Sequence, residues 1–151
     1  MKGLIQRVTQ ANVSVSSEVV AEISTGLLLF LGIEQGDEPA HAQALCRKVL
    51  SYRVFPDARG RMNQSLVEVG GELLIVPQFT LAADTRSGNR PSFSAAAPPA
   101  QAKALFEQFI RIARHQLGAH RIGCGQFGAD MQVGLTNDGP VTFLLESSDL
   151  A

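Results

Sequence analysis

Hydrophobic and polar residues alternate along the first part of the chain with a period of two, the period of a half-buried strand. The alternation covers residues 2–15 and resumes over residues 19–23 after the pair Ser16-Ser17. It ends in the uninterrupted apolar run of residues 26–33, a pattern typical of a buried strand. We therefore predict that the chain begins with antiparallel strands.

Two later segments carry apolar residues at the spacing of one face of an α-helix. We expect the first helix to start after Asp37 as its N-cap, with Pro39 just inside, and to end near Tyr52. The second is expected to run from about Pro99 to Gly118. The apolar stripes consist of Ala42, Leu45, Cys46, Val49 and Leu50 in the first helix and of Ala102, Leu105, Phe106, Phe109, Ile112 and Ala113 in the second.

Four further apolar runs predict strands. Leu66–Val69 and residues 72–81 are joined by a Gly-Gly pair, which predicts a hairpin. Residues 131–135 and 141–145 alternate on either side of Asn137-Asp138-Gly139-Pro140, which predicts a turn between two strands. Together the patterns predict about seven strands covered by two amphipathic helices, an α+β architecture.

Composition agrees with a single soluble domain spanning residues 1–151. The chain is 45% hydrophobic and 18% charged, with a net charge of −1, and it contains no internal repeat or linker. A near-zero net charge argues against a protein that coats duplex DNA or RNA, since such binding depends on many cations. No apolar run approaches the roughly 20 residues of a membrane span, and the N-terminal segment lacks signal-peptide features. We expect a cytoplasmic protein without membrane contact.

Motifs for common cofactors are absent. The two cysteines, Cys46 and Cys124, are too few and too isolated for a disulfide framework or a zinc site, and neither HExxH nor a phosphate-binding glycine loop occurs. His41, His115 and His120 leave few bases for a Ser-His-Asp arrangement. The sequence therefore predicts no metal and no nucleotide cofactor.

Small polar residues gather in three segments that follow or interrupt strands. These are PQFTL at residues 77–81, the loop DTRSGNRPSF at residues 84–93, and NDGPVT at residues 137–142. Each segment alone has an ordinary interpretation: Phe79 as core, Thr80 as a strand former, Asn-Asp-Gly as a turn. The three segments together indicate a function far more specifically than any one of them does.

Basic residues form two groups. Arg86 and Arg90 lie within the loop of residues 84–93 and are candidate contacts to a phosphate-bearing ligand. The second group lies around the end of the second helix, where a solvated helix face is the simpler interpretation: Arg111, Arg114, His115, His120 and Arg121.

Four segments together resemble the D-aminoacyl-tRNA deacylases, the family first known for removing D-tyrosine from its tRNA. They are LIQRVTQANVSV, YRVFPDARGRMN, QFTLAADTRSGNRPSFS and FGADMQVGLTNDGPVTF, and the resemblance extends over essentially the whole chain. It implies a mostly antiparallel, barrel-like β-sheet packed with two helices. It also implies a homodimer without cofactors that hydrolyses the ester between a D-amino acid, or mischarged glycine, and the terminal adenosine of tRNA. Its partners would be D-aminoacyl-tRNA and glycyl-tRNA.

The resemblance also implies roles for individual residues. Catalysis is assigned to the strand end that contains Gln78, Phe79 and Thr80. Chiral selection is assigned to a cis Gly-Pro peptide that reaches into the partner subunit's pocket, with Arg7 holding the segment in place. The residues of that segment are Asn137, Gly139, Pro140, Val141 and Thr142.

General chemistry makes such a site reasonable. An enzyme that accepts many D-amino acids must read the substituents at Cα, and fixed main-chain carbonyls can bind the α-ammonium while colliding with an L side chain. Backbone N–H groups, for which Phe79 and Thr80 are the candidates, can stabilise the oxyanion of ester hydrolysis. Thr80 can act as a nucleophile or as a positioning group for water assisted by the substrate's ribose 2′-hydroxyl. The second role is favoured because no base is evident to activate its hydroxyl.

One residue departs from the family pattern, since Pro77 stands where the family usually has serine. Proline has neither that hydroxyl nor an N–H group. A non-catalytic module that binds tRNA ends or another ligand is therefore one alternative, and a threonine-nucleophile hydrolase of small esters is another. Recognition of tRNA is expected to concentrate on the single-stranded acceptor end, with a shallow dependence on salt.

Overall fold

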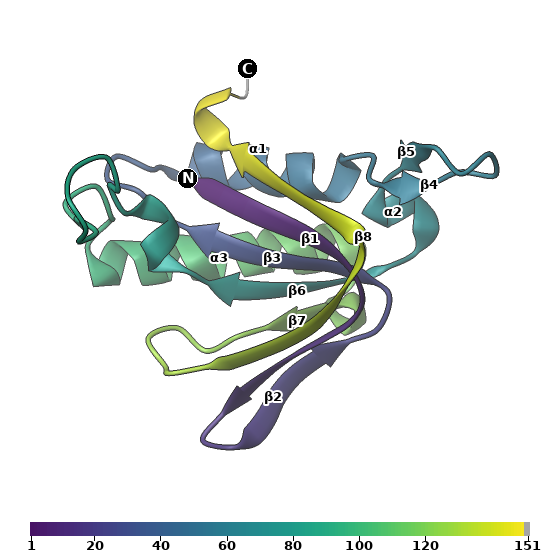
Figure 1. The fold of residues 1–151 in the computed structure, drawn as a ribbon, viewed down its shortest axis with the longest axis horizontal. Helices are drawn as coiled ribbons and strands as arrows, with labels where there is room; N and C mark the ends of the chain where they lie inside the picture. Colours follow the sequence, from purple (N-terminus) through teal and green to yellow (C-terminus); the bar gives the residue numbers. More distant parts are fainter. Residues whose placement is uncertain (150–151) are drawn as a thin grey trace.

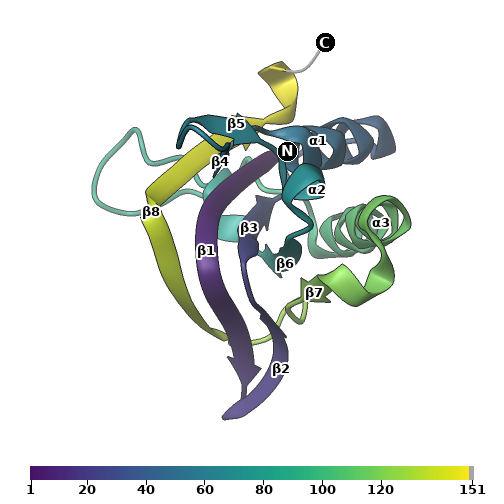
Figure 2. The same cartoon turned by 90° about the vertical axis from the view of Figure 1, so that its right-hand side faces the viewer.

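The computed structural model describes residues 1–149 as a strongly curved β-sheet with helices on one face (Figures 1 and 2). The strands are β1 (Lys2–Val15), β2 (Glu18–Ile23), β3 (Gly26–Gly32), β4 (Phe55–Pro56), β5 (Met62–Gln64), β6 (Glu72–Pro77), β7 (Ile122–Cys124) and β8 (Gln132–Glu146). The helices are α1 (Pro39–Ser51), α2 (Leu66–Val69) and α3 (Pro99–Leu117), with 3-10 turns η1 (Phe79–Ala82), η2 (Ala119–Arg121) and η3 (Ser147–Asp149).

Six strands form the main sheet, and β4 and β5 pair with each other as a separate two-stranded sheet. The long strand β1 bonds β8 along one edge, while its other edge bonds β3 and then β2. These three pairings are antiparallel, whereas β3–β6 and β6–β7 are parallel. The predicted α+β class and the nearly closed, barrel-like sheet are confirmed, although the sheet is more mixed than a mostly antiparallel one.

The central strand β3 is buried on both faces, which explains its uninterrupted apolar sequence. Leu27 and Leu29 belong to the core beneath the helices, together with Leu45 of α1 and Phe109 of α3. Leu28 points to the opposite face and joins a second core enclosed by the curved sheet. The predicted helices are confirmed, and α1 and α3 lie side by side over the first of these cores (Figure 2).

The predicted hairpin across Gly70 is wrong, because residues 66–69 form the short helix α2. Ser65 and Glu68 make a reciprocal capping box: the Glu68 N–H donates to the Ser65 hydroxyl at 3.2 Å, and the Ser65 N–H donates to the Glu68 carboxylate at 3.3 Å. Gly70 then ends the helix in the left-handed conformation, at φ +68°. The Ser-x-x-Glu spacing was the local signal for this helix.

The predicted turn at residues 137–140 is also wrong, because β8 runs through this segment as one strand. Asn137 lies opposite Val8 of β1, and Thr142 lies opposite Gln6. Two steps along β1 therefore correspond to five along β8. We call residues 138–141, the part that leaves the ladder, the β8 excursion.

Asp37 does not cap α1, since Glu38 is the N-cap residue. The Asp37 carboxylate instead lies 2.8 Å from the buried terminal ammonium of Met1, and its other oxygen accepts the Glu34 N–H at 2.7 Å. The ammonium also contacts Glu34 at 3.0 Å and the Ser147 hydroxyl at 3.0 Å. This cluster joins the start of β1, the turn before α1 and the end of β8. Within residues 1–149, no helix is long and apolar enough to cross a membrane.

Replacing Asp37 with asparagine should lower the free energy of unfolding by about 3 kcal/mol, because it removes the least exposed counter-charge of a buried ammonium. Urea denaturation of the variant and the parent measures the difference. The matched control is Asp130→Asn, which removes an exposed carboxylate. Equal stabilities of the two variants would show that the Met1 cluster does not hold the fold together.

Candidate functional site

The PQFTL segment lies at the carboxyl end of β6. The Gln78 N–H still donates to the Leu31 carbonyl of the neighbouring strand at 2.8 Å, and the chain then turns into η1. Phe79 and Thr80 are the first residues of this 3-10 turn, so their N–H groups have no partner within it. No acceptor for either group is present among the described residues. The strand end therefore presents two free backbone donors.

The Thr80 hydroxyl is exposed and accepts a hydrogen bond from the Gln78 side-chain amide. An amide N–H is a donor, so this contact orients the hydroxyl oxygen but cannot remove its proton. None of the three histidines lines the cavity beside this strand end. Cys46 is equally unsuited to catalysis, because burial raises the pKa of its thiol to about 12. These contacts support positioning rather than nucleophilic attack as the role of Thr80.

An open cavity of about 480 Å³ adjoins the strand end. Its lining contains no titratable side chain and consists of Val76, Pro77, Gln78, Phe79, Ala96, Ala97, Pro99, Ala102, Phe127, Gly128, Ala129, Met131 and Val133. Such a lining suits a ligand bound by apolar contact and main-chain hydrogen bonds, with no acid or base supplied by a side chain. In the part of the chain that the structure describes, no cluster of His, Cys, Asp and Glu could hold a metal ion.

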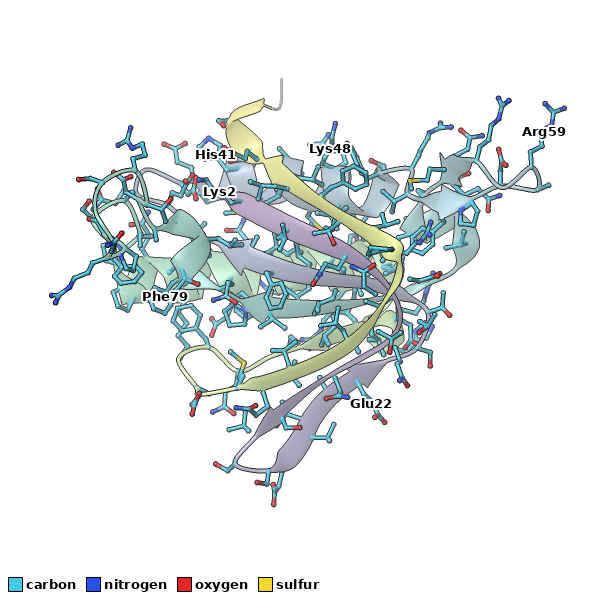
Figure 3. All side chains as sticks on the ribbon, in the orientation of Figure 1. Lys2, Glu22, His41, Lys48, Arg59 and Phe79 are labelled. Atoms are coloured by element: carbon cyan, nitrogen blue, oxygen red, sulfur yellow. The ribbon has the colours of Figure 1, made fainter. Side chains whose placement is uncertain are left out.

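Phe79 is not a core residue. Phe79 is 61% exposed and lines the cavity, and its ring lies 5.2 Å from that of Phe93. Figure 3 labels the position of Phe79 on the ribbon. The two rings form an exposed aromatic pair that can contact a planar group of a ligand. Sequence reasoning did not single out Phe93, nor Phe127 and Met131 of the cavity wall. Phe93 had a signal, because it is the one aromatic residue in the loop of residues 84–93.

The loop of residues 84–93 returns to the same end of the sheet. Asp84 and Ser92 bond each other's backbone, and past the loop the Ala97 N–H donates to the Ile33 carbonyl at 3.0 Å. The Arg86 guanidinium donates to Asp84 at 2.8 and 2.9 Å and holds the pKa of that carboxyl well below its usual range. Arg86 is thus engaged within the loop, whereas Arg90 makes no ion pair with any described side chain.

The NDGPVT segment is held at its base by Asn137. The Asn137 side-chain oxygen accepts the Val141 N–H at 2.7 Å, and its amide donates to the Thr142 hydroxyl at 3.0 Å. The Gly139–Pro140 peptide is cis, as the resemblance implies. Gly139 has φ +143°, and a Cβ there would lie 2.6 Å from a Val141 methyl group. The position therefore has no room for a side chain.

Arg7 holds the β8 excursion against the body of the chain. Its Nε donates to the Asp138 carbonyl at 2.9 Å, and its Nη1 donates to the Val54 carbonyl at 2.7 Å. The side chain is only 12% exposed, so these charge-assisted bonds are shielded from water. The structure thus places Arg7 against this segment, as expected from the sequence.

One chain does not bring the two halves of the expected site together. In the sheet register, the β8 excursion lies beside Val8 and, through Gly26, beside Glu72 at the start of β6. PQFTL begins at Pro77, at the other end of β6, which is roughly 17 Å away at 3.3 Å per residue. Figures 1 and 3 show the bend of β8 and Phe79 at opposite ends of the sheet.

The basic residues around the end of α3 differ in their roles, because one is bonded to the sheet and the others are exposed. Arg121 donates from Nε and Nη2 to the Gly71 carbonyl at 3.0 and 2.8 Å, so it fastens the end of α3 to the start of β6. Arg111, Arg114, His115 and His120 are exposed. This is the solvated helix face that the simpler interpretation predicts.

Comparisons with known proteins identify the family. Residues 4–146 match the family model described as D-Tyr-tRNA(Tyr) deacylase. The chain is 61% identical over 147 residues to the D-aminoacyl-tRNA deacylase of Marinobacter nauticus, covering 97% of this chain and 94% of that protein. It is 58% identical to the D-aminoacyl-tRNA deacylase of Stutzerimonas stutzeri, covering 97% and 100%.

Two solved structures share the fold. One, described as the c-Myc DNA unwinding element binding protein, has a TM-score of 0.93 and 39% identity, covering 97% of this chain and 98% of that chain. The other, described as a probable eukaryotic D-amino acid tRNA deacylase, has a TM-score of 0.84 and 17% identity, covering 96% and 98%, which is a likeness of fold alone. Because the family model and the relatives cover nearly the whole chain, this protein belongs to the D-Tyr-tRNA(Tyr) deacylase family.

Proposed function

We propose that this protein is a chiral proofreading hydrolase, which cleaves the ester between a D-amino acid and the terminal adenosine of tRNA and leaves L-aminoacyl-tRNA intact. Mischarged glycine, which also lacks an L side chain, is a second substrate. The observation that carries the proposal is the strand end at which Phe79 and Thr80 present free N–H groups beside an apolar cavity. The names of the relatives support the same reaction. Because the substrate is aminoacyl-tRNA, we place the activity in the cytoplasm.

The chemistry follows from what the cavity contains. Attack on the ester carbonyl creates an oxyanion, and one well-placed backbone donor stabilises such a charge by about 3–4 kcal/mol. Among the described side chains that line the cavity, none can act as general base, so the attacking water is assisted by the 2′-hydroxyl of the substrate's own ribose. Gln78 and Thr80 orient the ester, and the exposed Phe79–Phe93 pair contacts the terminal adenosine.

A homodimer completes each site. The β8 excursion lies too far from Phe79 to serve its own chain, so we place it in the cavity of a second copy. β8 also carries large exposed apolar side chains that a partner can cover: Leu135, Phe143 and Leu144. Gly139 and Pro140 have no partner in the register of β8 with β1, which leaves their carbonyls available for the substrate's α-ammonium.

Pro77 is the observation that favours the alternative, a module of the same fold that binds tRNA ends without hydrolysing them. The proline removes a hydroxyl and an N–H at the mouth of the cavity. It leaves the N–H groups of Phe79 and Thr80 untouched, however, and the Gln78 N–H is already bonded to Leu31. Catalysis that relies on residues 79 and 80 is therefore compatible with proline at this position.

The paired deacylation assay tests this function. The protein should release D-tyrosine from D-tyrosyl-tRNA at least about 100-fold faster than L-tyrosine from L-tyrosyl-tRNA, because a clash at Cα costs several kcal/mol. Pro77→Ser should change the rate by less than about ten-fold, since the proposed donors are backbone groups of other residues. Release of the D form no faster than in buffer, with activity appearing only in Pro77→Ser, would establish the binding-module alternative.

Thr80→Val separates positioning from nucleophilic attack, because valine keeps the shape and removes the hydroxyl. We expect kcat to fall by about ten-fold or less, as one orienting hydrogen bond is lost. A nucleophile would instead cost about 10⁴-fold or more. Single-turnover rates on D-tyrosyl-tRNA measure the difference, and Thr136→Val, which removes an exposed hydroxyl of β8 outside the NDGPVT segment, serves as the matched control. A loss of the larger size for Thr80→Val alone would assign the nucleophile to Thr80.

A further inference from the structure

The segment YRVFPDARGRMN has no role in the function proposed above, although it contains the paired strands β4 and β5. Residues 47–61 contain five of the 13 lysines and arginines in the chain, with a single carboxylate, that of Asp57. The protein as a whole has a net charge of −1, whereas residues 47–61 carry an excess of four positive charges, two of which lie within residues 53–64. We call residues 53–64 the basic hairpin.

The backbone of the basic hairpin is held by hydrogen bonds, and its cations make no ion pair with a described carboxylate, although Arg53 donates to the Asn63 side-chain oxygen at 3.2 Å. The Asp57 carboxylate accepts the Arg59 N–H at 2.8 Å and the Arg61 N–H at 3.0 Å, and these N–H groups, that of Arg61 first, keep the pKa of Asp57 below its ordinary value. The single carboxylate of the hairpin is thus occupied by backbone donors. The guanidinium groups of Arg53, Arg59 and Arg61 are exposed and pair with no described carboxylate. Figure 3 shows Arg59 at the far tip, away from the body of the molecule.

The basic hairpin is attached to the β8 excursion. Arg7 bonds both parts at once, with Nη1 on the Val54 carbonyl and Nε on the Asp138 carbonyl. Next to it the Tyr52 ring, which precedes the hairpin, packs edge-on against Phe143 of β8 at 5.7 Å. An arrangement that carries the excursion into the cavity of a second copy therefore also carries the base of the hairpin, at Val54, towards the rim of the same cavity.

We propose that the basic hairpin binds phosphate groups of the acceptor stem of the tRNA whose aminoacylated end occupies the other subunit's cavity. The inference rests on the function proposed above, which delivers a polyanion to that rim. Arginine matches phosphate through paired N–H donors, and three exposed guanidinium groups on a rigid turn form a surface that follows a sugar-phosphate backbone. The contact is confined to a few phosphates, in agreement with the shallow salt dependence expected from the net charge.

The test compares Arg59→Ala/Arg61→Ala with the parent on two substrates: D-tyrosyl-tRNA and the D-tyrosyl ester of adenosine, which has no phosphate. Between 50 and 200 mM KCl, the parent should lose about ten-fold more kcat/KM on the tRNA than the variant loses, because two phosphate contacts steepen the salt slope by nearly two. On the adenosine ester, parent and variant should respond to salt equally. Lys103→Ala/Arg111→Ala removes two exposed cations of α3 and is the charge-matched control.

Three results would overturn the inference: a salt slope of the hairpin variant equal to that of the parent, an equal reduction in the control variant, or a loss that appears equally on the adenosine ester. The first two deny a specific phosphate contact, and the third indicates a structural role for the hairpin. Failure of the proposed function itself has a different signature. In that case the parent would release D-tyrosine from neither substrate faster than buffer does.

Mixed dimers test whether the hairpin serves the other subunit. Ala129→Trp should fill the cavity of its own subunit and silence that site. When one subunit carries Arg59→Ala/Arg61→Ala and its partner carries Ala129→Trp, the working site faces an intact hairpin and should show the salt slope of the parent. When one subunit carries all three changes beside a wild-type partner, the slope should be reduced. The reverse pair of results would mean that each hairpin binds the tRNA of its own subunit.

Discussion

The pairing of β3 with β6 sets the distance on which the site depends. A parallel ladder from Glu72 to Pro77 holds the two ends of β6 apart, and both strands are buried between two cores, so this separation cannot collapse. The strand end with its free N–H groups lies at one end, and the β8 excursion lies at the other. In the proposed function, a chain built in this way offers one half of a site and receives the other half from a second copy. Dimerisation is then a condition of the chemistry that we propose.

The proposed site relies on main-chain groups more than on side chains. The cavity is apolar, the Gln78 amide orients the Thr80 hydroxyl, and the groups that can meet reacting atoms are the N–H groups of η1 and the carbonyls of the β8 excursion. Backbone groups act on the Cα substituents that D-amino acids share, which suits an enzyme that must accept many side chains. It also explains how Pro77 can replace a serine, because the substitution alters a side chain and a donor outside this set.

Regular patterns predicted the regular structure. The period of two over residues 2–33 and the helical stripes around Leu45 and Phe109 identified three strands and both long helices, because each pattern reports burial along one element. Predictions were wrong where contacts between residues far apart in the sequence determine the local structure. Asp37 was predicted to cap the first helix, but its carboxylate binds the ammonium of Met1 instead. Met1 lies 36 residues away in the sequence, so no local pattern could indicate this contact.

The candidate site likewise contains features that the sequence predicted and features that only contacts between distant residues determine. The segments PQFTL and NDGPVT have ordinary interpretations one at a time, and they were assigned to the site through their combination and the resemblance to a family. The contact of Arg7 that the resemblance implies is present. The turn expected at NDGPVT is instead an excursion within one strand. β1 pairs with β8 both before and after the excursion, so the chain does not reverse there. Phe79, an ordinary strand residue by its pattern, is exposed because the strand ends just before it.

Subunit complementation tests the central claim, that each site combines the strand end of one chain with the β8 excursion of another. Gly139→Val should disable the excursion, because a side chain there collides with Val141, and Ala129→Trp should disable the cavity. Each homodimer should be inactive on D-tyrosyl-tRNA. Co-expressed and purified as a mixed dimer, the two should recover about half of the parental kcat, since one site receives both intact halves. No recovery in a mixed dimer of confirmed composition would contradict the account.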